Sequence, residues 1–479
     1  MTLLTKSKYL NGLQCHRLLW HANKKLLPEI TLSDEHKFSQ GYEFEEYVKK
    51  LYPDAKDLKG LDFKENLIKT KQLIEQSNTI FEASFMIDDL FVRSDLIIPT
   101  KEGWDLYEIK STSKAKPPHI PDLAFQKHVI EKCGLKINKC FLIYLNKDYV
   151  KNGEINSKEL AIVEEVTEKV SLINDIEEKS KLFMDVINQD KSPEMHISMY
   201  CNKPYDCPLK KNCWATLPEN NVLQLTNWRV YWKLLEEGIK DLEDIPQGTK
   251  LSEKDKIMIE AVKTNKVQVN KEKARLFLDD LNYPLFHFDF ETFDTAVPIF
   301  DKSGPYQKMP FQYSLHIEQE DGAIEHKEFL AEGTKDPRFK LLDQMKTDLE
   351  GTGDIIVFNK SFEISVMKKL AEDFPEHKDW LEQAINRIVD LADPFRAFDY
   401  YNKSQKGSYS IKKVLPAITG KSYSELEINN GSDASMLYFY SHIKPKLENK
   451  EEIRKNLLKY CGLDTEGMVW IIKKLKKIN

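Results

Sequence analysis

The chain has 479 residues, of which 41% are hydrophobic and 31% charged, and a formal net charge of −6. This length suits two or three domains, and this composition is typical of globular proteins with substantial cores. No apolar run is long enough to cross a bilayer, and the first residues lack a signal-peptide layout, so we expect a cytoplasmic protein without a membrane partner. The acidic balance excludes a protein that is basic over its whole surface, but it allows a local basic groove.

Up to about residue 149 the sequence has the pattern of an α/β domain. Apolar, β-branched and aromatic residues predict strands over 79–87, 90–99, 103–111 and 139–146. Helices are expected over 43–53 and over 122–134, where apolar residues recur at helical spacing and a glycine ends the run. Residues 154–190 are rich in charge and are also expected to be helical.

Three charged residues interrupt the second and third of these strands. Asp95 lies in an apolar run, and Glu108 and Lys110 are two residues apart, so their side chains project from one face of a strand. Carboxylates on neighbouring strands can bind a hard divalent cation, and a lysine beside them can orient water or stabilise charge on a phosphate. An edge strand whose polar face meets solvent explains the same triplet about equally well.

The D…E-x-K arrangement, followed by a helix that carries Gln126, resembles the RecB-like branch of the PD-(D/E)XK nuclease superfamily. The resemblance implies that Asp95 and Glu108 are ligands of Mg²⁺ or Mn²⁺. It also implies that Lys110 is the catalytic lysine and that Gln126 supports the site.

Glu45, on the upstream helix, is expected from the same resemblance as a further metal ligand. It stands four residues after Gly41, where many relatives carry a metal-binding histidine. Glu43 or Glu46 can take that place instead.

The seven cysteines are an odd number in a reducing compartment, which argues against a disulfide framework. Three of them follow one another at intervals of six residues in a polar segment, and a fourth lies near the start of the chain: Cys201, Cys207, Cys213 and Cys15. The remaining three lie in apolar stretches and are expected to be core thiols: Cys133, Cys140 and Cys461.

One cysteine before the nuclease core and three after it resemble the pattern of RecB-like nucleases that hold an iron–sulfur cluster, including AddB and those of CRISPR adaptation. The resemblance implies a [4Fe–4S] cluster held by Cys15, Cys201, Cys207 and Cys213. Four thiolates also suit a structural zinc ion, but the wide spacing differs from the usual C-x2-C and favours iron–sulfur.

The second half of the chain starts with short helices broken by glycine and proline, expected to form a connector over 219–282. The connector loosely resembles helix–hairpin–helix segments that grip phosphates, although a plain spacer is the simpler interpretation. A second α/β pattern follows, with strands near 285–293, 311–319 and 354–360 and a long helix from about 451. The expected organisation is a nuclease domain over 1–218, the connector, and an α/β domain over 283–479.

Four carboxylates and a tyrosine are spread over three segments of this last domain. Asp289 and Glu291 share one face of a strand, Glu363 lies in the first turn of a helix, and Tyr460 and Asp464 are one turn apart on the last helix. Such a set suits a two-metal site that clamps a scissile phosphate, with the tyrosine positioning the water. A solvated helix face explains Asp464 alone but not all three segments in this order.

These segments resemble the three motifs of the DEDDy branch of the DnaQ-like exonucleases, which have a ribonuclease H-like fold. Asn359 to Glu363 match the second motif, N-x-x-F-D, with glutamate where aspartate is usual. Segments 389–396 and 407–418 also resemble connecting parts of that fold. The motif order over nearly the whole chain resembles a bacterial family that fuses a RecB-like nuclease to a DnaQ-like exonuclease domain.

The sequence therefore predicts an α/β enzyme that hydrolyses phosphodiester bonds with Mg²⁺ or Mn²⁺ at two sites. The expected partner is nucleic acid, as single strands or 3′ ends, with DNA favoured over RNA. Two alternatives stay open: a nucleic-acid-binding adaptor in which one or both sites are inactive and the metal cluster is structural, and a zinc-stapled scaffold that binds protein.

Overall fold

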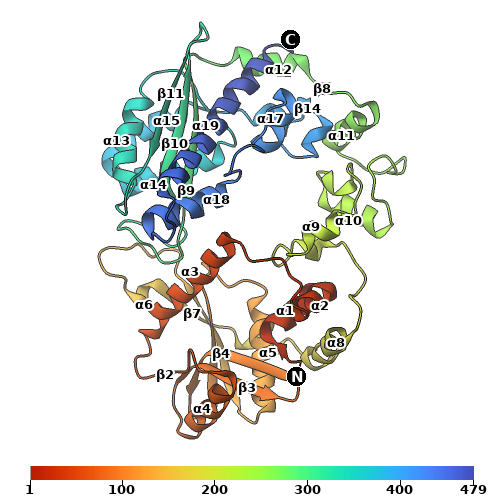
Figure 1. Ribbon diagram of the computed structural model, residues 1–479, viewed down its shortest axis with the longest axis vertical. Coiled ribbons are helices and arrows are strands. Elements are labelled where there is room, and N and C mark those ends of the chain that lie inside the picture. The colour runs from red at the N-terminus through yellow and green to blue at the C-terminus, as the bar shows by residue number, and fades with distance from the viewer. Residues whose placement is uncertain (1, 479) are drawn as a thin grey trace. The chain divides into compact units, whose positions relative to one another are not determined.

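The computed structural model describes residues 2–478 and has a mixed α/β fold, as expected (Figure 1). Its contacts divide the chain into two units. The first contains the residues up to Thr216 together with Thr295–Gln307, and the second contains Leu217–Asp294 and the residues from Lys308 onward. In the described residues, no helix is both long and apolar enough to span a membrane.

The first unit is built on a seven-stranded sheet in the order β2-β3-β4-β5-β6-β7, with β1 paired to β4. The strands are β1 (Leu4–Thr5), β2 (Lys56–Asp57), β3 (Ile80–Ile87), β4 (Leu90–Pro99), β5 (Trp104–Lys110), β6 (Ile137–Leu145) and β7 (Ala161–Glu165). Strands β5 and β6 are parallel, and the helix between them makes the crossover. The four strands expected before residue 149 are therefore confirmed as β3 to β6.

The helices of this unit are α1 (Lys6–Gln14), α2 (His16–Asn23), α3 (Leu32–Lys49), α4 (Phe63–Glu75), α5 (His119–Lys132), α6 (Ser157–Leu160), α7 (Thr167–Ser171), α8 (Ile176–Asn188) and α9 (Lys210–Trp214). Leu106 of β5 packs in one apolar core with α5, whereas Tyr107 packs in a second core with Phe44 and Val48 of α3. Because strand side chains alternate, Glu108 and Lys110 share the α5 face with Leu106.

The structure corrects two expectations in this unit. Residues 154–190 are not helical throughout, because Ala161–Glu165 form β7, an edge strand in which Val163 pairs with Ile143 of β6. Its glutamates favour helix locally, but pairing with a buried strand outweighs that preference. Cys133 is not a core thiol: it caps the end of α5 and is exposed, whereas Cys140 and Cys461 are buried as expected.

The second unit is built on a five-stranded sheet in the order β11-β10-β9-β12-β13. Strands β11, β10 and β9 are antiparallel neighbours, and β12 and β13 continue the sheet in parallel with β9. The bounds are β9 (Leu285–Phe293), β10 (Met309–Glu318), β11 (Ile324–Leu330), β12 (Ile355–Val357) and β13 (Ile388–Asp390); β8 (Gln268–Val269) and β14 (Tyr400–Tyr401) form a separate pair.

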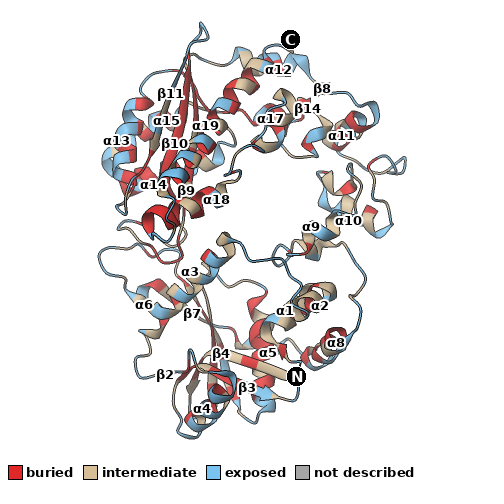
Figure 2. Cartoon of the chain, viewed as in Figure 1, coloured by how far each residue is buried: buried red, intermediate tan, exposed pale blue. Residues whose placement is uncertain are grey.

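The helices of this unit are α10 (Trp228–Glu236), α11 (Glu253–Thr264), α12 (Lys271–Asp279), α13 (Arg338–Asp348), α14 (Ser361–Asp373), α15 (Lys378–Asn386), α16 (Asp393–Arg396), α17 (Ile411–Thr419), α18 (Gly431–Tyr438) and α19 (Lys450–Leu475). Phe286, Phe288 and Phe290 of β9 pack with α13, α14 and α15 in one core. The alternate residues of β9 therefore face the other side of the sheet, where α19 packs on β9 and β10. Figure 2 shows that this central region is largely buried.

Two segments belong to a different unit from the one that the sequence pattern suggests. The helical segment expected as a connector belongs to the second unit, where Met258 and Val262 of α11 pack with Phe398 and Tyr401. Residues 295–307, between β9 and β10, belong to the first unit. There Ala296 is buried and its backbone N–H donates to Gln40 Oε1 at 2.5 Å.

Candidate active sites and cysteine cluster

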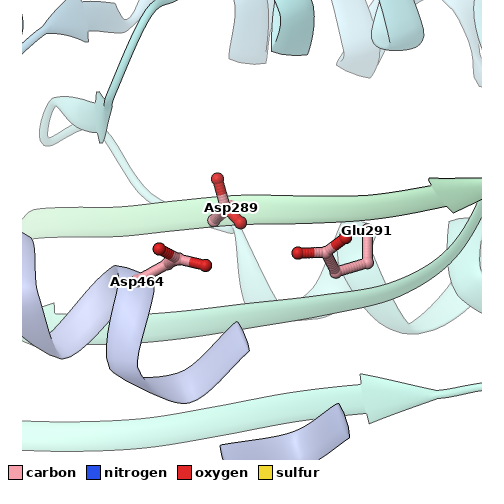
Figure 3. A group of neighbouring side chains, drawn as sticks. All are labelled: Asp289, Glu291 and Asp464. Atoms are coloured by element: carbon pink, nitrogen blue, oxygen red, sulfur yellow. The ribbon is translucent and has the colours of Figure 1, made fainter. Parts of the chain in front are cut away.

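The carboxylates predicted in the second unit converge on the face of the sheet that α19 covers. Asp289 and Glu291 come from β9 and Asp464 comes from the middle of α19. One oxygen from each of the three carboxylates lies within 4.8 Å of the others. Figure 3 shows the Asp464 carboxylate facing those of Asp289 and Glu291. The structure thus brings together the first and third predicted motifs.

Polar contacts beneath α19 fix the helix in this position. Gln312 of β10, which pairs with Glu291 in the sheet, donates from Nε2 to the backbone carbonyl of Leu457 at 2.9 Å. Ser314, which pairs with Asp289, is hydrogen-bonded to Thr465 of α19 at 2.7 Å. Because these contacts lie on both sides of Asp464, they fix the position of α19 along its axis and its rotation about that axis.

Glu363, from the second motif, is buried in the first turn of α14, with 2% of its surface exposed. Its Oε2 has no hydrogen-bond partner among the described residues. Burial, with the charge of Asp390 adding to it, raises the pKa of Glu363 to about 8. The charge of Glu363 in turn contributes to raising the pKa of Asp289, which places Glu363 in the same acidic group.

The whole acidic group is difficult to ionise. Burial and the repulsion of Asp464, Glu363 and Glu291 raise the pKa of Asp289 well above its usual range. Burial and Asp464 do the same for Glu291, and burial raises the pKa of Asp464 to about 6. Closely spaced buried carboxylates behave in this way when too little positive charge is near them. Positive charge placed among these carboxylates would therefore stabilise their ionised forms.

Tyr460 lies one turn before Asp464 and is almost fully buried. Burial and the nearby charges of Asp464, Glu291 and Asp289 raise the pKa of its phenol far above the usual range, so it stays protonated at neutral pH. Its ring lies 5.0 Å from Lys412 Nζ. The hydroxyl is therefore a neutral donor beside the carboxylates.

The sequence analysis did not identify three residues of this site. Tyr423 donates to Asp464 Oδ1 at 2.5 Å, and Lys412 lowers the pKa of Asp289, Glu291 and Asp464. Asp390 accepts from the backbone N–H of Asn359 at 2.8 Å and from Arg396 Nη2 at 2.8 Å, which fixes the turn before Glu363. Asp390 and Lys412 lie in the two segments noted above only as connecting parts of the fold.

In the first unit, the predicted residues form one network on the α5 face of the sheet. Lys110 Nζ donates to Glu108 Oε1 at 2.5 Å, and Gln126 Nε2 donates to Glu108 Oε2 at 2.6 Å. Asp122, which was not predicted, accepts from Lys110 at 2.9 Å and from Gln126 at 3.0 Å. Asp95 accepts from the backbone N–H of Ile109 at 2.8 Å.

Lys6, at the start of α1, is the second residue of this network that was not predicted. Its Nζ lies 3.1 Å from Asp95 Oδ1 and 3.1 Å from Glu108 Oε1. Burial, with Glu108 adding to it, raises the pKa of Asp95 to about 7. Although burial alone would raise it, Lys110 and Lys6 hold the pKa of Glu108 well below its usual range. Unlike the acidic group of the second unit, this network contains two cations for its three carboxylates.

Glu45 is not part of this network. It lies on α3, which packs through Phe44 and Val48 in the core on the opposite face of the sheet from α5. Its ionic partners are Lys49, at 2.8 Å, and Lys59, at 3.8 Å. Glu46 likewise pairs with Lys49 and Lys59.

The four clustered cysteines lie near one another. Cys15, between α1 and α2, packs with Cys207 and Cys213 in a small cluster, and the charge of Cys201 acts on the last two. Burial raises the pKa of Cys207 and Cys213. Within residues 2–478, the acidic group is the only set of three potential metal-ligand atoms that all lie within 4.8 Å of one another. Among the described residues, no three of the cysteine sulfurs therefore lie within 4.8 Å of one another.

Hydrogen bonds hold the N-terminal helices against the segment that carries the later cysteines. Gln14 Nε2 donates to the carbonyls of Tyr200 at 2.9 Å and Tyr205 at 2.7 Å. Arg17 Nη1 donates to Pro193 O at 2.9 Å, and Trp20 Nε1 to Gln189 O at 2.9 Å. The start and the end of the first 216 residues are therefore joined on either side of Cys15.

Comparison with known proteins supplies no activity. Residues 286–410 match a family described as a domain of unknown function, DUF2779, which includes Glu363 but ends before α17 and α19. The chain is 23% identical to the protein UU173 of Ureaplasma parvum, over 90% of this chain and 83% of that protein. It is 28% identical to MG366 of Mycoplasma genitalium, over 39% of this chain and 31% of that protein. Neither protein's name states a function.

Proposed function

We propose that the protein is a metal-dependent nuclease with a 3′–5′ exonuclease site in the second unit and a RecB-like site in the first. The observation that carries the proposal is the acidic group. One oxygen each of Asp289, Glu291 and Asp464 lies within 4.8 Å of the others, and Glu363 is buried beside them. Lys412 lowers the pKa of all three clustered residues but does not offset their burial. Natural proteins keep such uncompensated charge mainly where a bound cation or chemistry requires it.

The donor set fits Mg²⁺ or Mn²⁺, because all four ligands are carboxylates and hard divalent cations prefer oxygen. Two such ions, when bound, would polarise the scissile phosphate and lower the pKa of the attacking water. Asp289, Glu291, Glu363 and Asp464 would hold them. The sheet order, three antiparallel strands followed by two parallel ones, is compatible with the ribonuclease H-like fold that the motifs imply.

The remaining side chains have roles that follow from their positions. Tyr460 keeps its proton and can donate to, and so orient, the attacking water beside the carboxylates. Tyr423 holds one oxygen of Asp464 and so fixes the plane of that carboxylate. Lys412, whose charge acts on the same carboxylates, can balance the charge of the phosphates of a bound strand. We infer that the substrate is single-stranded nucleic acid or a 3′ end, with DNA preferred.

At the RecB-like site, Asp95 and Glu108 would be the ligands of a divalent cation, and Lys110 would stabilise charge on the phosphate. Gln126 and Asp122 hold Glu108 and Lys110 in place. Lys6 already bridges the two proposed ligands, so a divalent cation must compete with its ammonium group. Metal binding is therefore expected to be weaker here than at the exonuclease site.

The cysteines fit a [4Fe–4S] cluster better than a zinc ion. Four thiols come together from the start of the chain and from residues 201–213, and their wide spacing in the sequence differs from the C-x2-C usual for zinc. A cluster of this kind would contribute its binding energy to the folding of the first unit.

The decisive experiment compares single and double variants of the two sites. Asp289→Ala should abolish degradation of a 3′-labelled single strand, and Asp95→Ala should abolish a second, separable activity. If the wild-type protein cleaves no single or double strand with Mg²⁺ or Mn²⁺, the nuclease proposal is refuted and a binding adaptor takes its place. If Asp289→Ala abolishes every product, the first site is inactive.

A further inference from the structure

A pocket of about 750 Å³ lies between the helical segment after residue 217 and the sheet domain of the second unit. We call it the α10 pocket. Three segments line it: residues 223–226 with Trp228 and Tyr231 of α10, residues 358–359, and residues 406–411. All three belong to the second unit. The pocket thus lies at one of the contacts between the expected connector and the rest of the second unit.

Two of the three walls lead directly to the acidic group. Asn359 ends the strand segment that precedes α14, and its backbone N–H is held by Asp390, the residue whose charge acts on Glu363. Ser410 and Ile411 begin α17, whose next residue is Lys412. A chain whose terminal phosphate lay at the carboxylates would therefore have this pocket beside it.

Two of the walls present an aromatic ring that has a cation over it. Trp228 is 49% exposed, and the guanidinium of Arg229 lies 4.8 Å from its ring centroid. Across the pocket, Tyr409 is 42% exposed, and the guanidinium of Arg396 lies 5.3 Å from its ring. Each ring thus has a guanidinium over one face and is partly exposed, and aromatic rings together with cations are the combination that binds unpaired bases and their phosphates. Paired bases offer no free faces for such stacking.

The walls are held together without a ligand. Gly407 has a φ of +75°, and a Cβ at this position would lie 2.2 Å from the carbonyl oxygen of Gln224. The backbone N–H of Thr226 donates to the buried Asp255 at 2.7 Å. The pocket is therefore preformed, and binding a flexible strand does not require this wall to order.

We propose that the α10 pocket binds one or two unpaired nucleotides of a single strand whose 3′ end lies at the acidic group. Trp228 and Tyr409 stack on the bases, and Arg229 and Lys406 accompany the phosphates. This inference rests on the proposed exonuclease function and makes the connector a substrate-binding element rather than a spacer. It predicts a preference for single strands long enough to reach from the carboxylates to α10.

The test is equilibrium binding of fluorescein-labelled oligothymidylates to the full chain in EDTA, where no hydrolysis occurs. Trp228→Ala should weaken binding of a 12-mer roughly tenfold, the loss typical of one base stack. Trp228→Phe, which keeps an aromatic face, should restore most of the affinity. The matched control is Trp232→Ala, on the same helix but outside the pocket lining, which should bind within about twofold of wild type.

A second readout locates the contact. 2-Aminopurine placed in turn along the strand should be quenched at positions a few nucleotides from the 3′ end, and Trp228→Ala should remove that quenching. Equal affinity of wild type and Trp228→Ala, or quenching that the substitution leaves unchanged, would overturn the proposal. Because binding is measured in EDTA, an inactive wild-type protein refutes the nuclease function without deciding the pocket. An active protein with unaltered Trp228→Ala binding refutes the pocket alone.

Discussion

Replacing Glu363 by glutamine should stabilise the metal-free protein at neutral pH while abolishing exonuclease activity. The glutamate is buried, one of its oxygens has no hydrogen-bond partner in the described structure, and its pKa is raised from 4.5 to about 8. A folded-state pKa above the unfolded value means that the folded protein binds the extra proton. Stability from this group is therefore complete below about pH 4.5 and is lost as the pH rises toward 8.

The size of the effect follows from that interval. At pH 7 the glutamate lies about 2.5 pH units above its unfolded pKa and still below its folded one, which corresponds to about 3 kcal/mol of destabilisation. Glutamine keeps the shape of the side chain and carries no charge. The variant should thus gain up to about 3 kcal/mol at pH 7 and almost nothing at pH 4.5.

The assay is calorimetric unfolding in EDTA between pH 4.5 and 8, following the transition that shifts when Mn²⁺ is added to wild type. Mn²⁺ should raise this transition in wild type more than in Glu363→Gln, because the variant lacks one ligand. Glu376→Gln, at an exposed position in the turn after α14, is the matched control and should change neither quantity. A Glu363→Gln protein that is less stable than wild type in EDTA at pH 7 would refute the reasoning.

Three further outcomes are expected. Tyr460→Phe should lower kcat for single-strand degradation by roughly 100-fold, because it disorders the attacking water, and leave the Mn²⁺ dependence unchanged; Asp464→Asn should instead shift a Mn²⁺ titration to higher concentrations. Anaerobically purified protein should have a broad absorbance band at roughly 400 nm from thiolate-to-iron charge transfer. Cys15→Ser should lose this band and Cys140→Ser should keep it. A colourless wild-type protein that holds one zinc ion would contradict the iron–sulfur assignment. Lys6→Met should tighten Mn²⁺ binding at the RecB-like site about tenfold, because it removes the competing cation, as measured by calorimetric titration in an Asp289→Ala background.

The parts of the two sites that could be predicted are those that strand and helix periodicity displays. Asp289 and Glu291 are two residues apart in an aromatic strand, and Tyr460 and Asp464 are one turn apart on a long helix, so residue type and spacing identify them locally. The same holds for Glu108 and Lys110. The strand segments that carry these residues follow from the same patterns, whereas the order of the strands in each sheet comes from the structure.

The residues that escaped prediction reach the candidate sites only because the chain folds back on itself in space. Lys6 precedes Asp95 by 89 positions and is an unremarkable lysine at the start of a helix. Tyr423 reaches Asp464 from a segment with no periodic pattern. Residues Ala161–Glu165 were expected to be helical but form a strand for a related reason. The conformation of an edge strand depends on the strand it pairs with more than on its own residues.

The chain crosses between the two units at three places, after Thr216, after Asp294 and after Gln307. The first unit is therefore a discontinuous module, and its gene segment cannot be exchanged as one cassette. A fragment of residues 1–218 would lack Ala296 and Val297, which are buried in its core, and the ion pair between Lys151 and Asp301. Recombination that exchanged the coding segment of one unit would also damage the other, so the two units are expected to be inherited together.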